Sequence, residues 1–159
     1  MNCRAPLVLA ACFAGSLCLA GPAETQQPAS LKRPVANTVA PMQVVLANIT
    51  AFNRRDLEAF LSTYASDAQM IDLPSGRMLT TGTATLRERY RDQFENDCLE
   101  TMGVACPDLQ VTIVDTQTVG NYVIAKEAAR LKKDTPPLQL VVIYEVINAR
   151  ISRAWFIGK

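Results

Sequence analysis

The sequence of 159 residues contains no histidine and only seven glycines. The absence of histidine excludes a Ser-His-Asp triad, a Cys-His pair and a histidine-ligated zinc or iron site. Any proton transfer near neutral pH must then use a carboxylate, a tyrosine, a lysine or water. The few glycines do not have the spacing of a Walker or dinucleotide-binding loop, and we expect the protein to work without a cofactor.

An excess of charge of one sign is also lacking, since 16 lysines and arginines stand against 15 aspartates and glutamates. The sequence has no basic stripe and no alternation of basic with aromatic residues. Because neutralisation of phosphates dominates the affinity of proteins for nucleic acids, we expect no nucleic-acid partner.

One long apolar run is present, over residues 5–20, after Arg4 and before Gly21. A basic residue, an apolar stretch and a small residue at its end are typical of a signal peptide, which we predict over residues 1–20. The alternative of a membrane anchor is disfavoured because the run is shorter than the roughly 20 residues that span hydrocarbon. The segment Leu9-Ala10-Ala11-Cys12 leaves lipoprotein processing open, and only lipidation would attach the mature protein to a membrane. We expect a secreted or periplasmic protein.

Residues 21–41 have no repeating apolar face and contain four of the nine prolines. This composition predicts a flexible linker, so that the folded domain occupies residues 42–159.

Cysteine is scarce beyond the leader, where Cys98 and Cys106 are the only pair. They flank a short segment that contains Gly103, and a disulfide between them would persist in an oxidising compartment. Two buried free thiols are the alternative. A metal pair is a further possibility, but two cysteines without histidine do not complete a tetrahedral site unless distant carboxylates contribute, and we expect no metal site.

Periodicity of the apolar residues predicts helices in the first half of the domain and strands in the second. Val45, Ile49 and Phe52 form a helical stripe up to residue 53, and Asp56 is placed to cap the next helix. The further expected elements are a strand over residues 68–73, a helix over 83–94, and strands over 109–118, 121–131, 138–147 and 150–157. Helices followed by strands indicate the α+β class.

The order of these elements along the chain resembles that of a known family. Over residues 44–157 the sequence resembles the SnoaL-like branch of the nuclear transport factor two superfamily. The resemblance is carried by a helix capped by Asp56, a strand that bears Asp72, a second amphipathic helix opened by Gly82, and two closing strands. That superfamily also includes ketosteroid isomerases and scytalone dehydratases. The resemblance implies a cone-shaped, strongly curved mixed sheet wrapped around three N-terminal helices, an apolar pocket at the open end, and a homodimer.

Asp72 is the first candidate for chemistry, in the segment Ile71-Asp72-Leu73-Pro74-Ser75-Gly76. In the steroid isomerases the general base occupies the matching place. A carboxylate walled by Met70 and Leu73 would lose hydration, so its pKa would rise and it would accept a proton from carbon next to a carbonyl. The competing interpretation is an acid that caps the turn after its strand.

The steroid isomerases polarise the carbonyl with a tyrosine and a protonated aspartate, and simple register places Asn48 and Val142 at those points. Val142 has no donor, and Tyr144 on the same face is the substitute catalytic residue; the alternative is that Tyr144 only packs in the core. The predicted ligand-binding residues are Asn48, Phe52, Tyr64, Tyr90, Val142 and Phe156. Glu127 is expected to point away from the pocket, toward a surface cation. Trp155 is expected either at a dimer contact on the outer face of the sheet or in the core.

We therefore expect an exported domain that binds a small, largely apolar molecule. As an enzyme it would perform isomerisation, aldol-type cyclisation or dehydration without a cofactor, with Asp72 as base and Tyr144 or Asn48 orienting the carbonyl. A non-catalytic ligand carrier and a dimerising interaction module are the alternatives, because this fold hosts all three kinds of protein.

Overall fold

A computed structural model describes residues 39–95, 98–99, 104–105 and 108–158. The chain divides into two units, residues 1–34 and 35–159, and every described residue belongs to the second. The predicted signal peptide and most of the predicted linker lie outside the described residues, as does Cys106 of the predicted disulfide. No helix in the described part of the chain is long and apolar enough to cross a membrane.

Three helices come first: α1 (Pro41–Asn53), α2 (Leu57–Ser62) and α3 (Gly82–Glu95). Proline is well suited to the first position of α1, where its missing N–H would have no partner in any case. Asp56 caps α2 by accepting a 2.9 Å hydrogen bond from the N–H of Ala59, as predicted. Gly82 opens α3 at φ +82°, and a Cβ there would lie 3.3 Å from the carbonyl oxygen of Ser66, so that a side chain is disfavoured on both counts.

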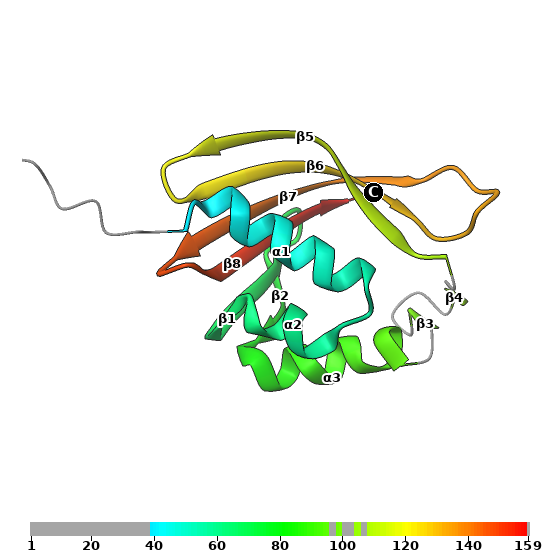
Figure 1. The fold of residues 1–159 in the computed structure, drawn as a ribbon, viewed down its shortest axis with the longest axis horizontal. Helices are drawn as coiled ribbons and strands as arrows, with labels where there is room; N and C mark the ends of the chain where they lie inside the picture. Colours follow the sequence, from blue (N-terminus) through cyan, green and yellow to red (C-terminus); the bar gives the residue numbers. More distant parts are fainter. Residues whose placement is uncertain (1–38, 96–97, 100–103, 106–107, 159) are drawn as a thin grey trace, which may run out of the picture. The chain divides into compact units, whose positions relative to one another are not determined.

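Six strands form one mixed sheet: β1 (Tyr64–Asp72), β2 (Arg77–Thr81), β5 (Gln110–Val119), β6 (Tyr122–Arg130), β7 (Leu138–Ile147) and β8 (Arg150–Gly158). Their order is β2-β1-β8-β7-β6-β5, and only β1 and β8 pair in parallel (Figure 1). Two short strands, β3 (Cys98–Leu99) and β4 (Val104–Ala105), form a separate ladder.

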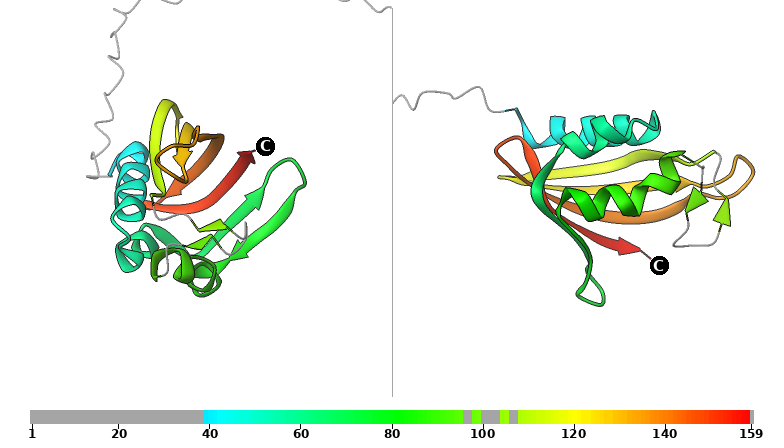
Figure 2. Two further views of the ribbon diagram at one scale, coloured as in Figure 1. Left: turned by 90° about the vertical axis from the view of Figure 1, so that its right-hand side faces the viewer. Right: turned by 90° about the horizontal axis from the view of Figure 1, so that it is seen from below.

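The sheet curls around the helices, which all lie on its concave side (Figure 2). Helix α1 packs against β5, β6 and β7, α3 packs against β1 and β2, and α2 contacts both other helices. This is the expected α+β cone, and the prediction of the fold class is confirmed.

Apolar side chains form a core between the helices and the concave face. Met70, Leu86 and Ile151 are at most 1% exposed, and burying each such side chain contributes about 1.5–3 kcal/mol. Val142 is completely buried in the same core.

Asn53 joins the end of α1 to the edge strand β5. Its Nδ2 donates to the carbonyl oxygen of Val111 and its Oδ1 accepts from the N–H of Val111, each at 2.8 Å. The amide replaces a missing neighbouring strand for one residue of β5, and so helps hold this edge against α1.

The β5–β6 and β7–β8 hairpins each turn through two residues. Gly120, at φ +58°, follows β5, as predicted. Between β7 and β8 the loop is Asn148-Ala149, and both residues have positive φ, +51° and +57°. Asparagine tolerates this conformation, whereas the Cβ of Ala149 makes it unfavourable.

Two strand boundaries differ from the sequence prediction. Strand β1 begins at Tyr64, four residues earlier than expected. Its pairing with β8 shifts register between Tyr64 and Gln69, and this shift interrupts the alternation of buried and exposed side chains. The first part of the strand therefore has no regular pattern that the sequence analysis could recognise. Strand β2 was not expected, since most of its side chains are exposed and it carries no apolar alternation.

Candidate functional site

A cavity of about 420 Å³ lies between the helices and the concave face of the sheet. It is lined by residues of all three helices and of five strands: Asn48, Ile49, Phe52, Phe60, Tyr64, Asp72, Arg89, Tyr90, Gln93, Leu109, Val111, Glu127, Ala129, Leu131, Leu138, Leu140, Tyr144, Phe156 and Gly158. The volume suits a small organic molecule, and the lining is mostly apolar with a few polar groups.

Glu127 lies inside this cavity, which contradicts the expectation that it points outward. Its side chain is only 3% exposed and shares the inner face of β6 with the buried Val123, Ala125 and Ala129. The expected position came from the register of the resembling family. The two-residue period of β6 itself, with Lys126 of opposite parity, was the signal that places Glu127 on the apolar face.

Tyr144 is the hydrogen-bond partner of Glu127, because its Oη donates to Glu127 Oε1 at 2.7 Å. Strands β6 and β7 are antiparallel, with Tyr144 opposite Val123 and Glu127 opposite Leu140. The pair Ala125 and Val142 lies between them, and the long tyrosine side chain spans these smaller residues.

Burial raises the pKa of Glu127 to about 7, although the hydrogen bond from Tyr144 opposes the rise. The acid is therefore close to half ionised at neutral pH, which suits a group that both accepts and returns a proton. Burial, and secondarily the charge of Glu127, raise the pKa of Tyr144 well above its usual value. Tyr144 thus keeps its proton and remains a donor.

Tyr64, at the start of β1, and Tyr90 of α3 also contribute hydroxyls to the lining. Burial raises the pKa of both hydroxyls, with a smaller contribution to each from the charge of Glu127, which indicates that the three groups share one environment. Asn48 is 3% exposed and donates a 2.8 Å hydrogen bond to Thr63 Oγ1, so its amide nitrogen is engaged in holding α1 to the end of α2.

The helix side of the cavity is a cluster of aromatic rings. Phe52, Phe60, Tyr90 and Phe94 make edge-on or tilted contacts with centroid separations from 4.9 to 6.3 Å. Such contacts stabilise each pair by about 0.5–1.5 kcal/mol beyond the burial of area, so this wall of the cavity is preformed.

Asp72 ends β1, opposite Phe156 of β8, and its half-buried side chain also lines the cavity. Its carboxylate accepts a hydrogen bond from the hydroxyl of Ser75, and that hydroxyl accepts from the N–H of Arg77 at 3.2 Å. Asp72 therefore has a partner in the turn as well as a position in the cavity. Leu73 is 42% exposed and is not among the described residues that line the cavity.

The structure brings together most of the residues predicted to form the site. Asp72 and Tyr144 line the cavity, as do five of the six predicted ligand-binding residues, Asn48, Phe52, Tyr64, Tyr90 and Phe156. Val142 is the exception, because it is buried in the core and is not among the described residues that line the cavity. Glu127, Arg89 and Gln93 were not predicted.

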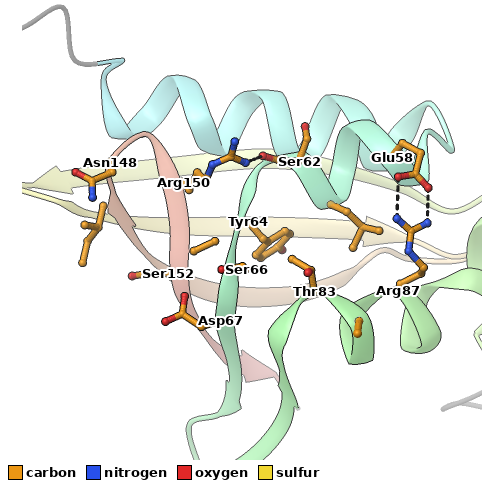
Figure 3. A pocket seen from close by; sticks show the side chains of 14 residues that line it. Glu58, Ser62, Tyr64, Ser66, Asp67, Thr83, Arg87, Asn148, Arg150 and Ser152 are labelled. Atoms are coloured by element: carbon orange, nitrogen blue, oxygen red, sulfur yellow. Dashed lines mark hydrogen bonds and ion pairs between the residues drawn. The ribbon is translucent and has the colours of Figure 1, made fainter.

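A second hollow, an open groove of about 870 Å³, lies beside α2, the start of α3 and the β7–β8 hairpin (Figure 3). Its lining includes Glu58 and Arg87, which form an ion pair, and Arg150, which donates to the carbonyl oxygen of Ser62. The hydrogen bond from Arg87 lowers the pKa of the exposed Glu58. A solvated acid of low pKa is a poor proton acceptor, so we place the candidate site in the other cavity.

Within the described residues, no group of three or more cysteine, aspartate and glutamate side chains is arranged to hold a metal ion. The predicted bond between Cys98 and Cys106 remains a prediction, since Cys106 lies outside the described residues.

The model of the SnoaL-like domain family matches residues 45–154. A comparison with curated protein sequences finds no match. Among solved structures, a cystatin-fold protein from Novosphingobium aromaticivorans is 23% identical with a TM-score of 0.61, and the match covers 75% of this chain and 98% of the other.

Two further solved structures are similar. A candidate ketosteroid isomerase from Kribbella flavida is 20% identical with a TM-score of 0.60, over 77% of this chain and 80% of that protein. A candidate SnoaL-like polyketide cyclase from Shewanella putrefaciens is 14% identical with a TM-score of 0.57, over 74% and 79%. At these identities the likeness establishes the fold.

Proposed function

Because this chain belongs to the SnoaL-like domain family, we propose that it binds a small, largely apolar carbonyl compound and moves a proton on it without a cofactor. The observation that carries the proposal is the hydrogen-bonded pair of Glu127 and Tyr144 inside the cavity. A desolvated acid beside a donor is the minimum that carboxylate acid/base chemistry requires. Isomerisation, aldol-type cyclisation and dehydration all begin with such a proton transfer.

In this proposal Glu127, as the carboxylate, accepts a proton from carbon next to the carbonyl. The C–H electron pair moves into the new carbon–carbon double bond, and the carbonyl oxygen becomes an enolate. Once Glu127 is protonated, it is a weaker acceptor for the hydrogen bond from Tyr144. The Tyr144 hydroxyl then donates its hydrogen bond to the enolate oxygen instead. Return of the proton to a second carbon completes an isomerisation and restores Glu127.

Asp72 is the second acid of the cavity, and we retain it as the alternative base. It differs from Glu127 in being half-buried and in accepting a hydrogen bond from Ser75. A non-catalytic carrier is the competing function, since the aromatic wall and the volume of the cavity suffice for binding alone.

Hydrogen–deuterium exchange on 2-tetralone, a bicyclic ketone with acidic C–H groups beside its carbonyl, separates these functions. The ketone is incubated with protein in deuterated buffer, loss of its proton signal is followed by NMR, and binding is measured in parallel by calorimetry. We expect the wild type to accelerate exchange and Glu127→Gln to reduce that acceleration by about 100-fold or more, with affinity retained.

Each other result rejects a part of the proposal. Loss of exchange in Asp72→Asn but not in Glu127→Gln would make Asp72 the base. Binding without any accelerated exchange would identify a carrier, and an absence of binding would leave an interaction module as the remaining interpretation.

We also propose that two copies pair through the outer face of the sheet. Ile124, Ile143, Trp155 and Ile71 are cross-strand neighbours that form an apolar row on this face, and the ring of Tyr122 lies 6.4 Å from that of Trp155. Apolar side chains with tryptophan and tyrosine are enriched at the centres of interfaces. Sedimentation of wild type and of Trp155→Glu tests the pairing, and a wild-type monomer at micromolar concentration would reject it.

Export through a signal peptide over residues 1–20 remains part of the proposal, supported by Arg4 and the apolar run that follows it. The mature chain should begin near Gly21, outside the cytoplasm. Intact-mass measurement of the native protein tests this, and a soluble cytoplasmic species that retains the leader would contradict it.

A further inference from the structure

Two polar side chains of α3, Arg89 and Gln93, lie four residues apart and both line the cavity. Residues at this spacing are neighbours on one face of a helix. The proposed proton transfer uses neither of them.

Gln93 is a buried polar residue that lines the cavity. The residue is 4% exposed and no hydrogen bond of its amide is found within the described residues, yet its amide atoms are not among the fully buried atoms without a partner, so they are accessible from the cavity. A buried amide is almost always hydrogen-bonded to protein or to another molecule in contact with it. Because Gln93 lines the cavity, a molecule in the cavity is the natural source of the missing bonds.

Arg89, an exposed residue that also lines the cavity, brings a positive charge to it. Its guanidinium lies beside the hydroxyl of Tyr90, where its charge opposes the rise that burial causes in the pKa of that hydroxyl. No carboxylate among the described residues lies within ion-pair distance of Arg89. Asp72 also lines the cavity, but its carboxylate accepts a hydrogen bond from Ser75 in the turn.

We propose that Arg89 and Gln93 form a subsite for an anionic oxygen group, so that the occupant of the cavity is amphiphilic, with an apolar body and a carboxylate. The inference rests on the proposed function, because it names the class of molecule that the same cavity binds. The apolar body packs on the aromatic wall, while the carboxylate accepts from the guanidinium and from the Gln93 amide. Charge-assisted bonds of this kind are about twice as strong as neutral ones.

Calorimetric titration with 2-naphthoate and 2-naphthamide tests the subsite, because the two probes have the same rings and differ in charge. Work at about pH 5.5 keeps naphthoate ionised while Glu127 is mostly protonated and does not repel it. We expect naphthoate to bind about tenfold to a hundredfold more tightly than naphthamide. Arg89→Gln should abolish this difference, and Gln93→Leu should reduce it.

Arg91→Gln is the matched control, since Arg91 is exposed on the same helix and is not among the residues that line the cavity. Thermal melting of each variant shows that it is folded. Equal binding of the two probes, or an equal effect of Arg89→Gln and Arg91→Gln, would overturn the anionic subsite and leave the proposed apolar site standing. If neither probe binds the wild type, the proposed binding function itself is overturned.

Discussion

The hydroxyl of Tyr144 donates a 2.7 Å hydrogen bond to the carboxyl of Glu127, and both groups are buried in a chain that has no histidine. Because burial raises the pKa of Glu127 to about 7, this carboxyl titrates in the pH range in which histidine usually titrates. Its ionisation is consequently linked to the stability of the fold.

The free energy of unfolding should fall as the pH rises from 4.5 to about 7, because Glu127 ionises in this range. The folded state holds this proton more tightly than the unfolded chain, whose carboxyl has the usual pKa of 4.5. The stabilisation is therefore fully present below pH 4.5 and is lost as the pH rises through about 7, a total of about 3 kcal/mol. Urea denaturation across this range should show a decline in the wild type that Glu127→Gln removes.

Glu58→Gln is the control for this experiment. Arg87 lowers the pKa of Glu58, so any linked stability of that acid is lost below pH 4.5 and not above it. Parallel curves for wild type and Glu127→Gln between pH 4.5 and 7 would show that Glu127 ionises normally in the folded protein.

Tyr144→Phe should move the titration of Glu127 to higher pH. The hydrogen bond from Tyr144 favours the ionised acid, so its removal raises the pKa of Glu127 above about 7 and costs about 1–3 kcal/mol once the carboxylate is unpaired. Carbon NMR of the Glu127 carboxyl measures the shift. Tyr122→Phe is the matched control, because Tyr122 bonds to Glu145 instead, and a shift of equal size in this variant would count against a specific bond.

Asp72→Asn and Ser75→Ala together distinguish a base from a turn cap. Asparagine still accepts the hydrogen bond from Ser75 but has no basicity, whereas Ser75→Ala leaves the carboxylate and removes the bond. If Asp72 is the base, Asp72→Asn lowers ketone exchange at an unchanged melting temperature. If Asp72→Asn leaves ketone exchange unchanged while Ser75→Ala lowers the free energy of unfolding by about 1 kcal/mol, Asp72 is a cap.

Ala149→Gly should stabilise the protein by about 0.5–1 kcal/mol. The φ of +57° at Ala149 is unfavourable for a residue with a Cβ, and this benefit of glycine exceeds the entropy that glycine adds to the unfolded chain. Gly120→Ala, at φ +58° in the other hairpin, should be destabilising by a similar or larger amount. Chemical denaturation measures both, and a loss of stability in Ala149→Gly would contradict the argument.

A disulfide between Cys98 and Cys106 should stabilise the exported protein by roughly 2–3 kcal/mol, because it closes a short loop in the unfolded chain. Thiol titration under denaturing, non-reducing conditions tests it directly. Two free thiols per chain would refute the bond.

The helices were predictable because their signals are local. Pro41 and the stripe of Val45 and Ile49 define α1 over the observed residues 41–53, and Asp56 marks the start of α2 by its own side chain. The curvature of the sheet has no local signal in the sequence, and its prediction depended on the resemblance to a family. Strand β2 was missed because its exposed side chains leave no pattern.

The site was predictable only where it follows from apolar periodicity. Phe52 and Tyr90 were placed correctly, since aromatic residues on the apolar faces of α1 and α3 turn inward; Tyr64 also lines the cavity, but from the start of β1. Glu127 was misplaced because a family's register was preferred to the alternation within β6. Arg89 and Gln93 were missed because the sequence alone does not show that this face of α3 borders a cavity.

Strand β8 lies in the interior of the sheet, between β1 and β7, although it follows both in the chain. Until residues 150–158 have been synthesised, β1 and β2 have no strand that joins them to the rest of the sheet, and the concave face is incomplete. The domain therefore acquires its structure late in synthesis, through contacts that join distant parts of the chain and are slow to form.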